Sequence, residues 1–143
     1  MSSERPFSEA LARLRAADLR PTRQRLALCK LLFDGGDRHL TAESLHSEAL
    51  SADVRVSLAT IYNTLHQFTE AGLLREVVVE SGKTYFDTNT SDHHHFYLED
   101  KGELMDIDGG KIVVQGLPQA PNGAEVSRVD VVVRVRGGSA QAT

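Results

Sequence analysis

The chain has 143 residues, a formal net charge of −4 and a hydrophobic content of 41%, enough for one domain or two small ones with a core. Its single cysteine, Cys29, excludes an internal disulfide and a four-cysteine structural zinc site. The sequence shows neither a signal peptide nor a segment long enough to span a membrane. We therefore expect a cytoplasmic protein with no membrane partner.

The charge is unevenly distributed along the chain. Residues 1–75 carry ten basic and nine acidic side chains, a net +1, whereas residues 76–143 carry six and eleven, a net −5. Between Arg13 and Lys30 there are six basic residues and one acid, Asp18. Phosphate backbones respond to such a local patch rather than to the total charge. This split favours a nucleic-acid-binding module followed by an acidic module.

Two helices are predicted at the beginning of the chain. The first covers residues 7–18 and ends before Pro21, because proline disfavours helical backbone in the residue ahead of it. The second covers residues 22–35, opens at Pro21 or Thr22, and ends at a pair of glycines. Cys29 lies in its apolar stretch, so we expect a small buried hydrophobe rather than a redox residue or a ligand.

Two more helices are predicted by their capping residues. Thr41 reads as an N-cap, with Ser44 three residues on. Ser57 can cap the fourth helix, and Gly72 can end it in a positive-φ conformation. Four apolar residues at three- and four-residue spacing give this fourth helix a buried face: Leu58, Ile61, Leu65 and Phe68.

The other face of the fourth helix carries short or polar side chains: Ala59, Thr60, Tyr62, Asn63, His66 and Gln67. Small residues allow close approach to DNA, and polar ones can meet base edges and phosphates, so this face suits insertion into the major groove. The alternative is an ordinary amphipathic helix with a solvated face.

A β-hairpin is predicted after the fourth helix. Residues 74–79 and 83–87 are β-like runs joined by 80–82, whose Ser-Gly pair is a turn signal. Helices followed by a hairpin describe a winged helix within an α+β protein, which we assign to residues 1–88. A helical bundle with an incidental hairpin is the alternative.

The remaining chain is predicted to form a second, smaller domain. The expected segments, in order, are a hinge at 89–92, strands at 94–99 and 103–107, a short helix within 109–116, a loop at 117–123, a strand at 125–136 and a disordered tail at 137–143. The domain proper covers residues 93–136. A segment of this size buries too little surface alone, so we expect it to pair with a second copy.

Three adjacent histidines, His93, His94 and His95, are the feature that folding explains least. Neighbours on a strand point to opposite sides, so His93 and His95 share a face and His94 points away. A His-x-His pair supplies two nitrogen ligands for zinc, iron, manganese or haem iron. The candidates for the remaining ligands are Asp87, at the end of the hairpin, and His39, in the loop before the third helix.

Metal bound by these four residues would tie the helical module to the β module. It would fix the angle between the domains and, in a dimer, the spacing of two recognition helices. A solvated polar turn is one alternative for the histidines. A small metalloenzyme with a histidine-bound ion is another, although the sequence has no HExxH-type helix and no evident general base beside the histidines.

A resemblance to a known family rests on four segments in this order: RHLTAE (38–43), SLATIYNTLHQFTEAGLL (57–74), KTYFD (83–87) and HHHFYLED (93–100). The chain resembles the ferric uptake regulator family of bacterial transcription factors over nearly its whole ordered length. RPTRQR, GDRHLTAE, the triple histidine followed by FYLE, and the DVVVRVR ending look most like the iron response regulators of alphaproteobacteria. The resemblance implies a homodimer with an N-terminal winged helix-turn-helix DNA-binding domain and a small C-terminal α/β dimerisation domain.

The resemblance also implies roles for individual residues. His39, Asp87, His93 and His95 match the family's inter-domain site for a divalent metal, zinc, manganese or iron. Tyr62 matches a tyrosine that contacts thymine. The full set of candidate DNA-binding residues is Arg20, Arg23, Ser57, Ala59, Thr60, Tyr62 and Asn63, where Arg20 matches a basic residue near the minor groove and Asn63 replaces an arginine of many relatives.

Cysteine usage and the histidine run set the expected ligand. The family's Cys-x-x-Cys pairs are absent, with Leu98 and Lys101 where the first pair would be. In the iron response regulators the triple histidine is implicated in haem binding, which makes His93, His94 and His95 a candidate haem site. The leading hypothesis is a haem- or iron-responsive repressor of iron and haem metabolism genes, bound to an AT-rich palindromic double-stranded DNA operator. A peroxide-sensing or a conventional divalent-metal-activated regulator of the same family is the alternative.

Overall fold

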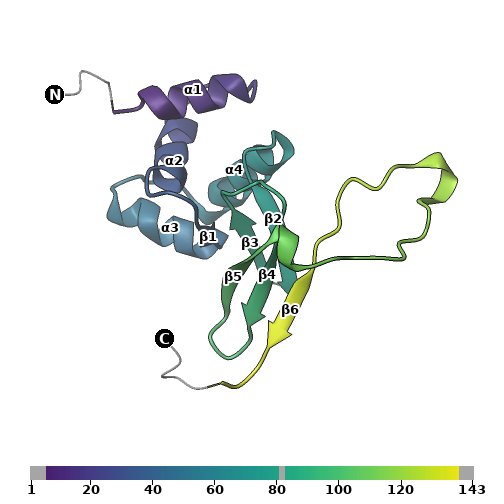
Figure 1. Cartoon of the computed structure of the whole chain (residues 1–143). Coiled ribbons are helices and arrows are strands. Elements are labelled where there is room, and N and C mark those ends of the chain that lie inside the picture. The colour runs from purple at the N-terminus through teal and green to yellow at the C-terminus, as the bar shows by residue number, and fades with distance from the viewer. Residues whose placement is uncertain (1–5, 81–82, 139–143) are drawn as a thin grey trace. The chain divides into compact units, whose positions relative to one another are not determined.

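The computed structural model describes residues 6–80 and 83–138 (Figure 1). Helices and two separate sheets are present, which confirms the α+β class. The chain divides into two compact units between Thr90 and Ser91, a point inside the segment predicted as a hinge. Bending at that segment stays a prediction.

The described residues of the first unit form four helices and three strands: α1 (Ser8–Ala16), α2 (Arg23–Phe33), β1 (His39–Leu40), α3 (Ala42–Ser51), α4 (Leu58–Glu70), β2 (Arg75–Glu80) and β3 (Lys83–Asp87). The predicted caps are confirmed. The Thr22 hydroxyl accepts the Arg25 N–H at 3.2 Å, and the Ser57 hydroxyl accepts that of Thr60 at 3.1 Å. Gly72 ends α4 with a φ of +83°, which costs glycine no strain.

Thr41 and Ser44 form a reciprocal capping box at the start of α3. The Ser44 backbone N–H donates to the Thr41 hydroxyl at 3.1 Å, and the Thr41 N–H donates to the Ser44 hydroxyl at 3.1 Å. Two amide groups that the helix leaves without intrahelical partners are thereby satisfied. This cap fixes where α3 begins, directly after the short strand β1.

The core of the first unit is built from the apolar faces of its helices. Its fully buried members include Leu14, Leu28, Leu32, Leu45, Ile61, Leu65 and Phe68. The predicted stripe on α4 is confirmed, with Leu58 packed against this core and only partly buried. Cys29 is also fully buried, and burial raises the pKa of its thiol to about 11. It packs as a small apolar residue, as predicted.

The sheet of the first unit has the order β1-β3-β2, with both pairings antiparallel. The predicted hairpin is confirmed in β2 and β3, whereas its turn residues Ser81 and Gly82 lie outside the described part of the chain. The prediction that His39 lies in a loop is wrong. His39 and Leu40 form β1 by pairing with β3. The sequence could not reveal this strand, because two residues are too few to show a period-2 pattern.

The second unit contains β4 (His93–Leu98), β5 (Glu103–Asp108) and β6 (Val132–Val135) in the order β5-β4-β6. β4 and β5 form an antiparallel hairpin, and β6 runs parallel to β4. Both strands of the hairpin are confirmed to within a residue at each end. The predicted tail begins at Gly137, whose N–H donates to the Asp100 carboxylate at 2.8 Å, and residues 139–143 of it lie outside the described range.

The short helix expected within 109–116 is confirmed as a single 3-10 turn, Gly109–Lys111, which goes no further because glycines and β-branched residues are weak helix formers. The strand expected at 125–136 is wrong in its extent and is reduced to β6. Its register pairs His95 with Val132, so residues before 130 would need partners ahead of the first residue of β4. The expected loop at 117–123 holds one further 3-10 turn, Pro121–Gly123.

Across 6–80 and 83–138, no helix is both long and apolar enough to cross a bilayer.

Candidate metal centre and nucleic-acid interface

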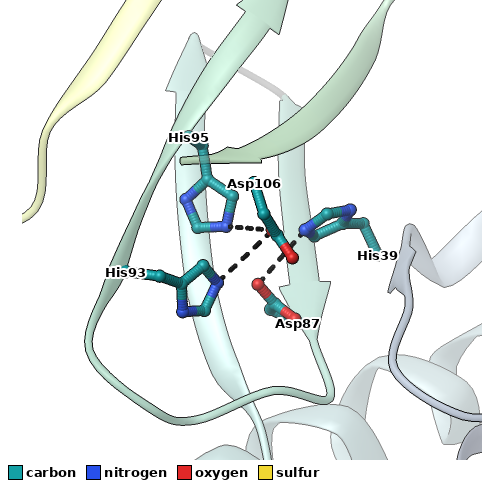
Figure 2. A group of neighbouring side chains, drawn as sticks. All are labelled: His39, Asp87, His93, His95 and Asp106. Atoms are coloured by element: carbon teal, nitrogen blue, oxygen red, sulfur yellow. Dashed lines mark ion pairs between the residues drawn. The ribbon is translucent and has the colours of Figure 1, made fainter. Parts of the chain in front are cut away.

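His39 and Asp87 meet across the pairing of β1 with β3. They are direct partners in its register, and directly opposed residues on antiparallel strands point to the same side. The His39 Nε2 lies 3.2 Å from the Asp87 Oδ2 (Figure 2). Asp87 is almost completely buried. We call these two residues the β1–β3 pair; they are two of the four metal ligands expected from the sequence.

Backbone and side-chain hydrogen bonds hold the β1–β3 pair in place. The Arg38 N–H donates to the Thr88 hydroxyl at 2.9 Å, and the Thr88 N–H donates back to the Arg38 carbonyl at 3.1 Å. The Asn89 N–H donates to the Asp87 Oδ1 at 2.9 Å. One carboxylate oxygen of Asp87 is thus anchored by backbone, and the other faces His39. Partners of this kind orient metal ligands.

The second donor group lies on the β4–β5 hairpin and consists of His93, His95 and Asp106. The Nε2 atoms of both histidines lie 3.5 Å from the Asp106 Oδ1 (Figure 2), and the two rings meet edge to face at 4.6 Å. Both histidines are buried. We call these three residues the hairpin group; one ligand atom from each lies within 4.8 Å of the others.

A hydrogen bond sets the tautomer of His93. Its Nδ1 lies 2.7 Å from the Ser91 carbonyl, and a carbonyl oxygen only accepts, so Nδ1 carries the proton. In the neutral imidazole, Nε2 would then be the nitrogen that offers a lone pair to a metal ion.

Sequence reasoning missed Asp106. The β4–β5 register places it directly opposite His95, on the face that His93 and His95 share. Counting outward from the predicted strand ends at Glu99 and Glu103 would have placed Ile107 opposite His95, whereas the observed register pairs Leu98 with Glu103 and so brings Asp106 to His95. The missing signal was the pairing register, not the residue type.

His94 points to the opposite face of β4, as its position between His93 and His95 predicts. Its Nδ1 accepts the Val131 N–H at 3.1 Å. Phe96, Ile107 and Val133 lie on the same face by the strand register and line a hollow of about 490 Å³. Among the described residues, His94 belongs to no cluster of three or more histidine, cysteine or acidic side chains.

The candidate DNA-binding residues of α4 lie at the surface of the first unit. Ala59, Tyr62 and Asn63 are exposed, and Thr60 is half-buried, where its N–H and hydroxyl are both held by Ser57. The Tyr62 hydroxyl donates to the Glu43 carboxylate on α3 at 2.5 Å. This bond lowers the pKa of Glu43 and raises that of Tyr62.

The basic run between Arg13 and Lys30 contributes both structure and surface charge. Arg25 donates to the Arg20 carbonyl at 2.9 Å and to the Gln67 side chain at 3.0 Å, which links α2 to α4. Arg20 and Arg23 are exposed. These two guanidinium groups therefore remain at the surface, as a phosphate contact requires.

The chain is similar in sequence and in structure to known proteins. The model of the ferric uptake regulator family matches residues 16–134. The chain is 37% identical over 107 residues, 74% of its own length and 71% of the relative's, to the "Peroxide-responsive repressor PerR" of Staphylococcus aureus strain Mu50. Its structure is similar to that of the ferric uptake regulator from Pseudomonas aeruginosa with manganese, with a TM-score of 0.71, 27% identity and 91% and 98% of the two chains covered. The regulator of Vibrio cholerae shares the fold, with a TM-score of 0.68, 22% identity and coverages of 88% and 98%.

The protein is therefore a metal-responsive transcriptional regulator and not an enzyme. It belongs to the ferric uptake regulator family. The hypothesis of a small metalloenzyme is wrong. The relatives from Staphylococcus aureus are named peroxide-responsive repressors, so assignment to the iron response regulator branch stays a prediction.

Proposed function

We propose that the protein is a homodimeric repressor whose binding to operator DNA is controlled by one divalent metal ion. The β1–β3 pair and the hairpin group would share this ion, with His39, Asp87, His93, His95 and Asp106 as its ligands. The observation that carries the proposal is the chemistry of these two donor groups. Each joins imidazole nitrogens to a carboxylate, and backbone partners orient Asp87 and His93.

The donor set fits a first-row divalent metal. Imidazole and carboxylate ligands suit zinc, iron and manganese, and no thiolate is present to favour a softer ion. The Pseudomonas aeruginosa regulator is described with manganese. When bound, the ion supplies a fixed positive centre that removes the mutual repulsion of the two carboxylates. The ligands come from both sides of the 89–92 segment, so occupancy would restrict how that segment bends.

The first unit supports DNA binding through a winged helix. α4 presents Tyr62 and Asn63 at the surface, the β2–β3 hairpin would form the wing, and Arg20 and Arg23 would contact phosphates. In a dimer, the angle within each chain sets the separation of two α4 helices, and half-sites in DNA recur at one helical turn. Metal control of operator binding follows from that geometry.

The second unit supports pairing with a second copy. Several large apolar side chains are exposed there: Phe96, Met105, Val113, Val114, Leu117 and Val126. Apolar surface of this extent marks an interaction site in a small unit, and a symmetric dimer is the commonest way to cover it.

Haem control is a second candidate, favoured by the face of β4 opposite to the hairpin group. His93 and His95 are engaged with Asp106, so His94 is the histidine available to haem iron in this arrangement. A hollow borders the His94 face and is lined by apolar and charged side chains: Phe96, Ile107, Ile112, Val133, Asp106, Asp108 and Lys111. A repressor of iron and haem metabolism genes would use this face as its sensor. Peroxide sensing, in which hydrogen peroxide would act as the oxidant at bound ferrous iron and oxidise a ligand histidine, is supported by the similarity to the Staphylococcus aureus repressors.

The test is binding to an AT-rich palindromic duplex, with manganese, zinc, ferrous iron and haem added separately. Specific binding that appears with a divalent ion and is lost in the His93→Ala, His95→Ala double variant supports the proposed site. Binding that haem abolishes in the wild type and not in His94→Ala supports haem control instead. Absence of specific binding under all four conditions would contradict the proposed function.

A further inference from the structure

Glu43 on α3 contacts the proposed recognition helix, α4, through a side-chain hydrogen bond. Its carboxylate accepts the hydroxyl proton of Tyr62, with 2.5 Å between the two oxygens. Both side chains are exposed. An acidic group beside a DNA-facing residue repels phosphate, so its position there needs a compensating role.

One face of the Tyr62 ring stacks on a neighbouring ring that in turn contacts the core. Tyr62 stacks on His66, one turn further along α4, with 6.5 Å between ring centroids and 23° between planes. His66 in turn meets the edge of the buried Phe86 ring at 5.9 Å. The Tyr62 ring is therefore held at its hydroxyl by Glu43 and on one face by His66.

This arrangement limits what Tyr62 can offer to DNA. The hydroxyl has one proton, and it is engaged in the hydrogen bond to Glu43. A hydroxyl so engaged cannot donate to the acceptors that purines and thymine present in the major groove, and its oxygen can only accept from the amino groups of adenine and cytosine. The uncovered face and edge of the ring remain, and these are apolar. The one apolar group on any base edge in the major groove is the C5-methyl of thymine.

We propose that Glu43 is a positioning residue that makes Tyr62 selective for the thymine methyl group, by holding the hydroxyl and turning the ring toward the base. The inference rests on the proposed function, since it requires α4 to enter the major groove. It adds a determinant of sequence preference that lies on α3, outside the recognition helix. It also explains why an exposed carboxylate lies beside a residue that faces DNA, where it repels phosphate.

The experiment measures the effect of one methyl group. The manganese-loaded full-length protein is titrated into a duplex selected from a random library, and into copies with each thymine replaced by uracil. At the position that Tyr62 contacts, wild-type protein should bind the thymine duplex about fourfold more tightly, the effect of burying one methylene-sized group. In Glu43→Ala this ratio should fall toward one.

Further variants separate positioning from charge and from direct contact. Glu43→Gln keeps an acceptor oxygen and should keep the ratio, whereas Glu70→Ala removes an exposed acid at the end of α4 and should leave the ratio unchanged. Tyr62→Phe should match Glu43→Ala, and the double variant should lose nothing further. Overall affinity rises in any variant that loses a negative charge, which is why the ratio is the readout.

Two outcomes would overturn the inference: no position with a thymine preference, or an unchanged ratio in Glu43→Ala. If the ratio is unchanged in Glu43→Ala and Tyr62→Phe also loses affinity, the hydroxyl itself contacts a base. Wild-type protein that binds no duplex in preference to another would overturn the proposed function, and the inference with it. Far-UV circular dichroism of each variant verifies that α3 and α4 remain folded.

Discussion

The Asp106 Oδ1 lies 3.5 Å from the Nε2 of His95, its direct partner across the β4–β5 hairpin. Two residues eleven positions apart thereby present their donor atoms to one point. His93, two residues before His95 on the same strand, presents a third. A hairpin with a fixed register is a rigid support for metal ligands, because the pairing determines which side chains share a face.

Asp106→Ala should weaken manganese binding at least about tenfold, the loss seen when groups that support a metal ion are removed. The reason is that the variant removes an anionic oxygen from the hairpin group while leaving both imidazoles in place. Competition with a metal-binding dye measures the affinity. Glu103→Ala is the matched control, since it removes a carboxylate from the same strand whose side chain lies on the opposite face of the hairpin. Equal affinity in both variants would exclude Asp106 from the site.

Thr88→Val should loosen the β1–β3 pair without touching a ligand. Valine preserves the shape of threonine but lacks the hydroxyl that accepts the Arg38 N–H. The unfolding free energy should fall by about 1 kcal/mol or more, because a partly buried amide loses its partner. Manganese affinity should fall by about tenfold, as for outer partners of metal ligands.

Thr88→Ser is the control for this change, because it restores the hydroxyl and should recover most of both losses. Urea denaturation of the metal-free protein gives the stability, and the dye competition gives the affinity. A valine variant with lower stability and full metal affinity would show that the Arg38–Thr88 contact supports the fold alone.

The sequence predicted the elements of the first unit better than the contacts between them. Caps and breakers act locally, so Thr22, Thr41, Ser57 and Gly72 were readable without tertiary information. The strand β1 was not, since two residues acquire extended structure only by pairing with β3. The same limit explains why His39 was placed in a loop.

The second unit was predicted less well because its elements depend on one another. β6 extends only as far as β4 provides partners, which no local pattern in 125–136 reveals. Asp106 was missed for the related reason that its role comes from being opposite His95. The alternation of His93, His94 and His95 was readable, because the period of a strand is a local property.

Cys29 should be unreactive in the native protein. Burial raises the pKa of its thiol to about 11, so at about pH 8 only about one thiol in a thousand is ionised, and the thiolate is the nucleophile. Labelling with a disulfide reagent should therefore proceed at the rate of unfolding and become fast in denaturant. Labelling of one thiol within seconds under native conditions would show that α2 opens locally.

The ion pair between Arg38 and Glu48 should make stability depend on pH in the acid range. The guanidinium donates to both carboxylate oxygens, one of them at 2.8 Å, and its hydrogen bonds hold the pKa of Glu48 below the ordinary value of 4.5. A group whose pKa is lowered by folding stabilises the native state above its unfolded pKa. That contribution is lost as the pH falls through the folded pKa. Both side chains are partly exposed, at 29% and 37%, so the contribution should be no more than about 1 kcal/mol.

The measurement is the difference in unfolding free energy between wild type and Glu48→Gln at several pH values. The difference should be constant from about pH 7 to about pH 5, and should shrink below the ordinary glutamate pKa as both proteins become neutral at this position. Glu70→Gln is the control, since Glu70 is an exposed acid on α4 and its neutralisation should leave the pH profile almost unchanged. A Glu48→Gln profile parallel to that of wild type down to about pH 3 would show that the pair contributes nothing to folding.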